Sequence, residues 1–210
     1  MKVKKIIEIA LAVGLVAALA LGSSAALAED QIPAAKAAFT TNNVYAATVG
    51  KAHSETEWFT VLSSQIKTGQ PKDLVIDVSA ETALITSTKL SGTAGSEASA
   101  AVQIQVLVDG VSAMPGPVTF DNRLLRITGD LTHHYGGFTL DIDDHWIEVY
   151  LSTKAAHPFN FAIENVGEGV HTIEVQAKLV KSEFGELAIA DAAIGHVSVV
   201  VDEAMFKYAG

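Results

Sequence analysis

The 210-residue chain contains no cysteine, and this absence excludes several kinds of chemistry at once. Without a thiol there can be no thiolate zinc site, no haem attached through cysteine, no thiol nucleophile and no lipid-modified N-terminal cysteine. Small exported domains often depend on disulfides because their cores are small. This chain must instead be stabilised by its core, which a domain of about 180 residues can provide, since roughly 70% of its surface is buried on folding.

Basic residues are also scarce. The chain holds 14 lysines and arginines against 24 aspartates and glutamates, which gives a formal net charge of −10. Nucleic acids and anionic membrane surfaces attract basic patches, so this balance argues against both as partners. The acidic residues are dispersed and form no like-charged tail. Such a surface favours solubility and suits divalent cations.

The N-terminus has the three parts of a secretory signal peptide. Three lysines lie within the first five residues, an apolar run extends from Ile6 to Leu21, and the small-residue exit Ala26-Leu27-Ala28 follows. This pattern predicts a signal peptide over residues 1–28 and a mature protein that starts at Glu29. We therefore expect a secreted, periplasmic or cell-surface protein, with no membrane association after cleavage.

Two other interpretations of the N-terminus stay open. An uncleaved anchor would use an apolar run of about 16 residues, slightly short for a membrane-spanning helix. A pilin-like stem would explain Glu8 inside the apolar run, but no Gly or Ala precedes the run at the required place. If the signal is cleaved, three lysines and one glutamate leave with it, so the net charge changes from −10 to −12.

From Trp58 onward the sequence alternates with the period of two that is typical of β-strands. The clearest examples are Val102–Val108, which ends at the turn pair Asp109-Gly110, and His171–Leu179. Helical patterns between strands are missing, which argues against a parallel α/β fold. The spacing predicts an all-β protein, an antiparallel β-sandwich of the jelly-roll or immunoglobulin-like kind, with about eight to ten strands.

We assign residues 58–210 to this single sandwich domain. Residues 29–57 contain few large apolar side chains, too few to offset about 1–2 kcal/mol of backbone entropy per ordered residue. They are expected to form a leader that is mobile or depends on a partner. If it is ordered, it lies on a sheet, its own or a neighbour's, and the hypothesis is that it donates a strand to a neighbour's open sheet edge. On this hypothesis, deleting residues 29–50 leaves a soluble sandwich that no longer assembles.

The densest polar cluster is a candidate metal site. Asp141, Asp143, Asp144 and His145 offer carboxylate oxygens and an imidazole within five residues, and calcium is bound by six to eight oxygens. The central glycine and closing glutamate of a helix–loop–helix calcium loop are absent, and the flanks are predicted strands. The alternative is a solvated turn between two strands.

Trp146 and Tyr150 are candidate ligand-binding residues. They share one face of a predicted strand, opposite Ile147, Val149 and Leu151. Flat aromatic rings can stack on sugars, so a glycan is a possible ligand. The alternative is that both rings pack beneath a loop or against the leader.

Nothing in the chain singles out a catalytic site. The nucleophile elbow Gly-x-Ser-x-Gly is absent, and no pair of carboxylates stands out for glycoside hydrolysis. His171 lies on the apolar face of its strand and is interpreted as a half-buried histidine bonded to the backbone. His157 is interpreted as a surface residue.

These observations favour a secreted, non-enzymatic β-sandwich with a structural, adhesive or surface-assembly role. Its expected partners are copies of itself or other surface proteins. No cofactor is required by any motif. The alternative is an extracellular module that binds a carbohydrate or depends on calcium, supported by the acidic cluster and the two aromatic residues.

Overall fold

The computed structural model describes residues 37–48, 53–91, 95–129, 133–135, 138–140, 146–185 and 188–206. Every regular element in these ranges is a β-strand, and none of the described residues forms a long apolar helix that could cross a membrane. The strands are β1 (Ala37–Asn42), β2 (Ala46–Ala47), β3 (His53–Glu55), β4 (Phe59–Thr68), β5 (Lys72–Ser91), β6 (Ser96–Val108), β7 (Val111–Ser112), β8 (Val118–Ile127), β9 (His133–Tyr135), β10 (Phe138–Leu140), β11 (Trp146–Val166), β12 (Gly169–Phe184) and β13 (Ile189–Ala204).

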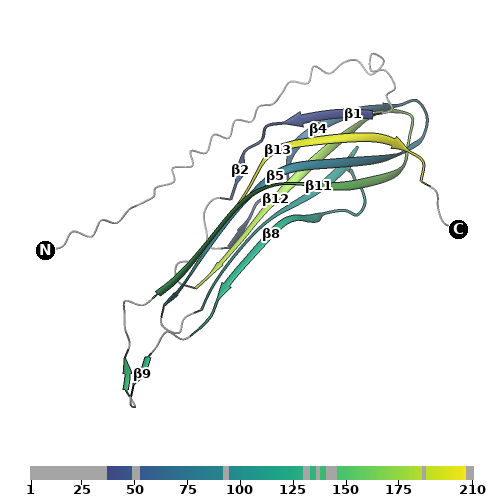
Figure 1. The fold of residues 1–210 in the computed structure, drawn as a ribbon. Coiled ribbons are helices and arrows are strands. Elements are labelled where there is room, and N and C mark those ends of the chain that lie inside the picture. Colours follow the sequence, from purple (N-terminus) through teal and green to yellow (C-terminus); the bar gives the residue numbers. More distant parts are fainter. Residues whose placement is uncertain are drawn as a thin grey trace.

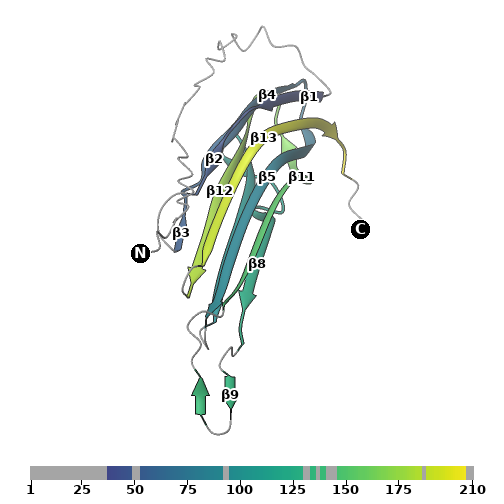
Figure 2. The same ribbon diagram turned by 60° about the vertical axis from the view of Figure 1, so that its left-hand side comes forward.

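The strands form two antiparallel sheets packed face to face (Figure 1, Figure 2). The first sheet has the order β1-β13-β5-β11, with β2 also paired to β13. In the second sheet, β12 pairs with β3 and β4 on one side and with β6 on the other, and β6 pairs in turn with β7 and β8. A small separate hairpin joins β9 and β10.

The pairing identifies the sandwich as a jelly roll. Eight strands carry it: β1, β4, β5, β6, β8, β11, β12 and β13. In chain order the first pairs with the eighth, the second with the seventh, the third with the sixth and the fourth with the fifth. This is a two-stranded ribbon wrapped into two sheets, the connectivity of a jelly roll. The all-β prediction is confirmed, and the jelly roll is the one of the two expected architectures that is found.

The core follows from the alternation seen in the sequence. Every second residue of β6 and β12 is buried between the sheets, and Val175 of β12 lies between Leu62 of β4 and Val106 of β6. Asp109 and Gly110 both have positive φ, 51° and 81°, so they form the two-residue turn that joins β6 to β7. Val106 and Val175, in the middle of the two alternating stretches, are fully buried, and the predicted turn is confirmed.

Two strands are longer than their sequence pattern suggests. The segments Trp146–Leu151 and Phe159–Ile163, which the polar middle and Pro158 separate in the sequence, belong to one continuous strand of 21 residues, β11, which pairs with the 20-residue β5. Such strands extend roughly 65 Å, which makes the sandwich elongated (Figure 1). Pro158 interrupts the pattern in the sequence but not the strand.

The segment expected to be a leader contributes strands to its own chain over its described residues. β1 and β2 pair with β13, and β3 pairs with β12. Thr40 Oγ1 lies 2.7 Å from Ser64 Oγ, and the Asn42 side-chain amide donates to the carbonyl of Val61 at 2.8 Å. These bonds join the two sheets along this side. The sandwich therefore starts at Ala37 rather than at residue 58, and removing β1 and β2 would uncover the edge of β13.

We expect Val175→Ala to lower the free energy of unfolding by about 2 kcal/mol, because it removes two buried methyl groups and leaves a partial cavity. Urea unfolding measures this. The matched control is Val111→Ala, since Val111 is 60% exposed and its truncation should change stability by less than about 0.5 kcal/mol. Equal effects of the two substitutions would contradict the packing described above.

Candidate functional site

The predicted metal ligands Asp141, Asp143, Asp144 and His145 lie outside the described residues. In the part of the chain that the structure describes, no group of three or more His, Cys, Asp or Glu side chains is placed to hold a metal ion. Calcium binding by the acidic cluster therefore stays a prediction.

The predicted ligand-binding residues lie at the beginning of β11. Trp146 is the first residue of the strand and pairs with Ser91, and Tyr150 pairs with Ser87. The Tyr150 side chain is 60% exposed on the outer face of the sheet. This exposure agrees with the predicted facing of Tyr150, but no observation identifies a ligand for it.

The backbone of β11 forms an open sheet edge. Among the described residues, β11 pairs along its length with β5 alone, and its other side bonds only at Ala162. There the Ala162 N–H donates to the Met114 carbonyl at 2.9 Å, and the Met114 N–H donates to the Ala162 carbonyl at 2.7 Å.

The bonds of Ala162 show which backbone groups of β11 point outward. Residues of an antiparallel strand direct their N–H and C=O groups alternately toward and away from one neighbour. The register of β11 with β5 is unbroken from Trp146 to Ile163. Because Ala162 bonds away from β5, the even-numbered residues from Glu148 to Asn160 also direct their backbone groups away from β5.

Two residues protect the middle of this edge against the addition of another strand. Pro158 stands at an even position, where its missing N–H costs no bond to β5, and it cannot donate to an added strand. The Lys154 ammonium lies 3.0 Å from Glu81 Oε2, and this hydrogen bond and charge raise the pKa of Lys154. Proline and lysine are common protections against strand addition at sheet edges. Residues 146–153 have no such protection.

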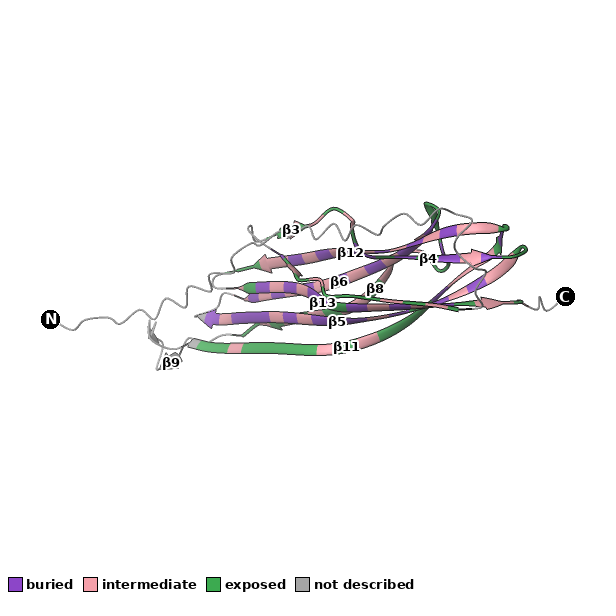
Figure 3. Cartoon of the chain, turned by 90° about the horizontal axis from the view of Figure 1, so that it is seen from above, coloured by how far each residue is buried: buried purple, intermediate pink, exposed green. Residues whose placement is uncertain are grey.

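The unprotected stretch also exposes apolar side chains. Ile147 and Leu151 are 47% and 42% exposed although they lie on the face of β11 that points toward the other sheet. Figure 3 shows β11 as the outermost strand on its side, coloured exposed over most of its length. Leu124 on the neighbouring edge strand β8 is exposed as well.

The exposure of Leu151 has a cause in the interior, whereas Ile147 pairs with the buried Leu90. Along the inward face of β5, Leu74, Ile76 and Val78 occupy one end, whereas Thr86 and Thr88 lie between Leu84 and Leu90 toward the other. The hydroxyls of both threonines are buried and lack a hydrogen-bond partner among the described residues. Leu151 and Val149 pair with these two threonines, so they lie beside hydroxyls rather than against large apolar groups.

Polar contacts link the two sheets on this side. Thr82 donates to Asp121 Oδ2 at 2.6 Å, and His157 Nε2 lies 3.4 Å from the same oxygen. Arg123 Nη2 donates to Thr153 Oγ1 at 2.7 Å. His157 was interpreted as a surface residue; it is half-buried here, and it points toward the interior because its register partner Ala80 does so. Such contacts tie β8 to β11 without covering the outer edge of β11.

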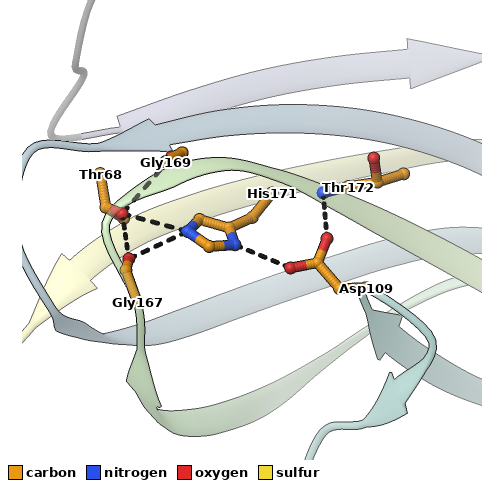
Figure 4. Close-up of polar contacts among 6 residues, drawn as sticks. All are labelled: Thr68, Asp109, Gly167, Gly169, His171 and Thr172. Carbon is orange, nitrogen blue, oxygen red and sulfur yellow. Dashed lines mark hydrogen bonds and ion pairs between the residues drawn. The ribbon is translucent and has the colours of Figure 1, made fainter. Parts of the chain in front are cut away.

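A second cluster has the residue types of a catalytic triad (Figure 4). His171 Nδ1 donates to Asp109 Oδ2 at 2.7 Å, and His171 Nε2 lies 3.1 Å from Thr68 Oγ1 and 3.0 Å from the Gly167 carbonyl. Thr68 is fully buried and donates its own proton to Gly167, so no substrate can reach its oxygen. Asp109 also accepts from the Thr172 N–H at 2.8 Å. The cluster thus ties two turns to β12. The predicted bond from His171 to the backbone is found, and the side chain is buried rather than half-buried.

One shallow pocket lies at the far end of the sandwich, lined by Gln70, Pro71, Lys72, Asp73, Asn165, Ala204, Met205 and Phe206. Its carboxylate, Asp73, accepts backbone N–H groups from Phe206 at 2.8 Å and Asn165 at 3.0 Å. Both hydrogen bonds lower the pKa of Asp73, and the bond from Phe206 has the larger effect. Asp73 fastens the residues after β13 to the end of β11, and no convergent set of reactive groups surrounds it among the described residues.

Comparison by sequence finds no match among protein-family models or among curated proteins. Among solved structures, the chain is similar to the structure of infectious bursal disease virus Gx strain, with TM-score 0.36 and 13% identity over 81% of this chain and 33% of that one. It is also similar to the VP2 subviral particle of that virus, with TM-score 0.31 and 14% identity over 80% of this chain and 34% of that one. The chain spans about a third of these proteins, and its own fold assignment rests on its strand pairing.

We expect Asp109→Asn to lower the free energy of unfolding by about 1–2 kcal/mol, because one amide oxygen cannot replace both carboxylate contacts and the buried His171 loses its charged partner. Asparagine tolerates the positive φ of this position, so backbone strain does not contribute. Thermal and urea unfolding measure the loss. Asp77→Asn on the exposed outer face of β5 is the control, and an equal effect there would contradict the structural role of the cluster.

Proposed function

We propose that this chain is an exported, non-enzymatic structural protein that assembles at a surface through the free edge of β11. One observation carries the proposal: the stretch 146–153 combines outward-directed backbone groups with exposed Ile147, Tyr150 and Leu151. An exposed apolar edge strand is a template for another strand. Assembly on such an edge needs no catalytic group.

The charge balance and the signal-like N-terminus support the rest of the proposal. A net charge of −10 keeps the protein soluble before it assembles. The buried Thr68 rules out the one triad-like cluster of the described residues as a hydrolytic site. Assembly with other surface proteins would use the same edge as assembly with copies of the chain.

Export has a direct test. Because Ala26 and Ala28 suit the small-residue pockets of a signal peptidase, the exported protein should begin at Glu29. Intact-mass measurement of the protein recovered outside the cytoplasm checks this. Recovery of a chain that still begins at Met1 would contradict cleavage and favour an anchor.

Assembly is tested by sedimentation of the exported protein over a wide concentration range, with and without a chelator. We expect association that a chelator does not change. Ser152→Pro should weaken it, because position 152 directs its N–H outward and tolerates proline as position 158 does. Its cost in folding stability should stay below about 1 kcal/mol.

Thr153→Pro is the matched control for that substitution. Its N–H points toward β5, so proline there breaks a ladder bond and should destabilise the fold more than Ser152→Pro does. A protein that stays monomeric at every concentration would overturn the proposal. If its melting temperature rose with added calcium, the binding-module function would take its place.

A further inference from the structure

We infer that the partner of the β11 edge is a second copy of this chain, bound about a two-fold axis through Leu151, so that β11 pairs with β11 of the partner. The inference rests on the proposed function and narrows it to one partner and one register. The two five-stranded sheets would join into one continuous antiparallel sheet, in which the order β1-β13-β5-β11 of one copy is continued by the reverse order in the other. Such a two-fold contact is self-complementary and closes on itself.

The backbone limits the possible registers. Only even-numbered residues of β11 have outward N–H and C=O groups, so an even residue must face an even residue of the other copy. The two-fold axis can therefore pass through any residue of the stretch, but never between two residues. Pro158 limits the pairing at one end because it lacks a donor.

Charge selects one of these registers. With the axis at Leu151, Glu148 stands opposite Lys154 of the other copy, and this ion pair occurs twice. An axis at Tyr150 would place Lys154 opposite Trp146, and an axis at Ser152 would place it opposite Tyr150. The side chains of directly opposed residues lie on the same face of a sheet and within reach of each other. The exposed ion pairs fix the register more than the affinity.

The Lys154 ammonium can serve both copies. It has three donors, of which Glu81 takes one at 3.0 Å. Glu148 accepts a hydrogen bond from Ser87 at 3.2 Å and is exposed on the same outer face, where its register partner on β5 is Lys89. The hydrogen bonds to Glu81 and from Ser87 do not have to break for the ion pair between copies to form.

The same register matches the exposed apolar residues. Leu151 faces Leu151 of the other copy across the axis, Val149 faces Thr153, and Ile147 faces Ala155. These odd positions lie on the inward face, where Ile147 and Leu151 are uncovered in the single chain. The pairing extends from Trp146 to Ala156 and ends before Pro158, so it uses the whole unprotected stretch.

The absence of cysteine makes the register directly measurable, since one introduced thiol is the only thiol in the chain. At the axis, opposed residues form a non-hydrogen-bonded pair with Cα atoms about 4.5 Å apart, which suits a disulfide. We expect Leu151→Cys to give covalent dimers under mild oxidation at least tenfold faster than Tyr150→Cys or Ser152→Cys. Val111→Cys, exposed and far from β11 in sequence, gives the rate of random collision.

Charge exchange is an independent test. Glu148→Lys alone should weaken self-association at least about fivefold, because Lys faces Lys twice, and Lys154→Glu alone should do the same through opposed carboxylates. Mixing these two variants should restore association, since each Lys then faces a Glu. Far-ultraviolet circular dichroism and melting curves check that both variants are folded.

Three results would overturn the inference, and they separate it from the proposed function. Faster cross-linking at position 150 or 152 than at 151 would move the axis. Association that Ser152→Pro abolishes, with no rescue in the mixed variants, would leave the assembly function standing with another register or partner. A wild-type protein that never associates would overturn both.

Discussion

The need of every backbone N–H and C=O for a partner is the constraint on which this structure depends. A sandwich of two open sheets has four edges, and each edge strand leaves one row of these groups unpaired. On one side the edge strands are β1 with 6 residues, β2 and β3 with 2 and 3, and β4 with 10. Hydrogen bonds from Thr40 and Asn42 also join the sheets there. On the other side the edges belong to β8, with 10 residues, and to β11, with 21. The longest edge among the described strands is therefore that of β11.

The interior adds a second asymmetry in the same direction. Large aliphatic side chains fill the space between the sheets at one end, where Phe161 of β11 is fully buried. Toward the beginning of β11 they give way to Thr86, Thr88 and small alanines of β6 such as Ala98. A hydroxyl offers an apolar neighbour less stabilisation than a methyl group does. The first residues of β11 are therefore held mainly by their ladder with β5, and their apolar side chains keep part of their surface in water.

The sequence predicted the parts of the fold that alternation controls. Val106, Val175 and the Asp109-Gly110 turn were placed correctly because a half-buried strand and a two-residue turn each have a local signature. The length of β11 could not be predicted, since its middle is polar and contains Pro158, and only pairing with β5 extends the strand through it. The role of residues 37–48 was also hidden, because they contain few large apolar side chains and the largest, Phe39 and Tyr45, are exposed, so no buried face indicates a strand that pairs with β13, far away in the sequence. Trp146 and Tyr150, named from the sequence for their aromatic character, lie on β11, and their role in binding a ligand stays a prediction. The free edge itself has no sequence signature, because it depends on which strands lie beside β11.

The positions of the protective residues along β11 show whether this edge is built to stay unpaired or to pair with another strand. An edge strand that must stay unpaired along its whole length would carry proline or charged residues throughout, as natural edge strands commonly do. Here Pro158 and Lys154 protect only the later part, where His157 also turns inward toward Asp121. The earlier part carries β-branched, aromatic and aliphatic residues, the types that stabilise cross-strand pairs.

The one acidic residue of this earlier part, Glu148, lies six positions from Lys154, so both are three positions from Leu151. Residues equally spaced about Leu151 become neighbours when two copies of β11 pair antiparallel about it. Glu148 and Lys154 are thereby placed to favour one specific strand addition.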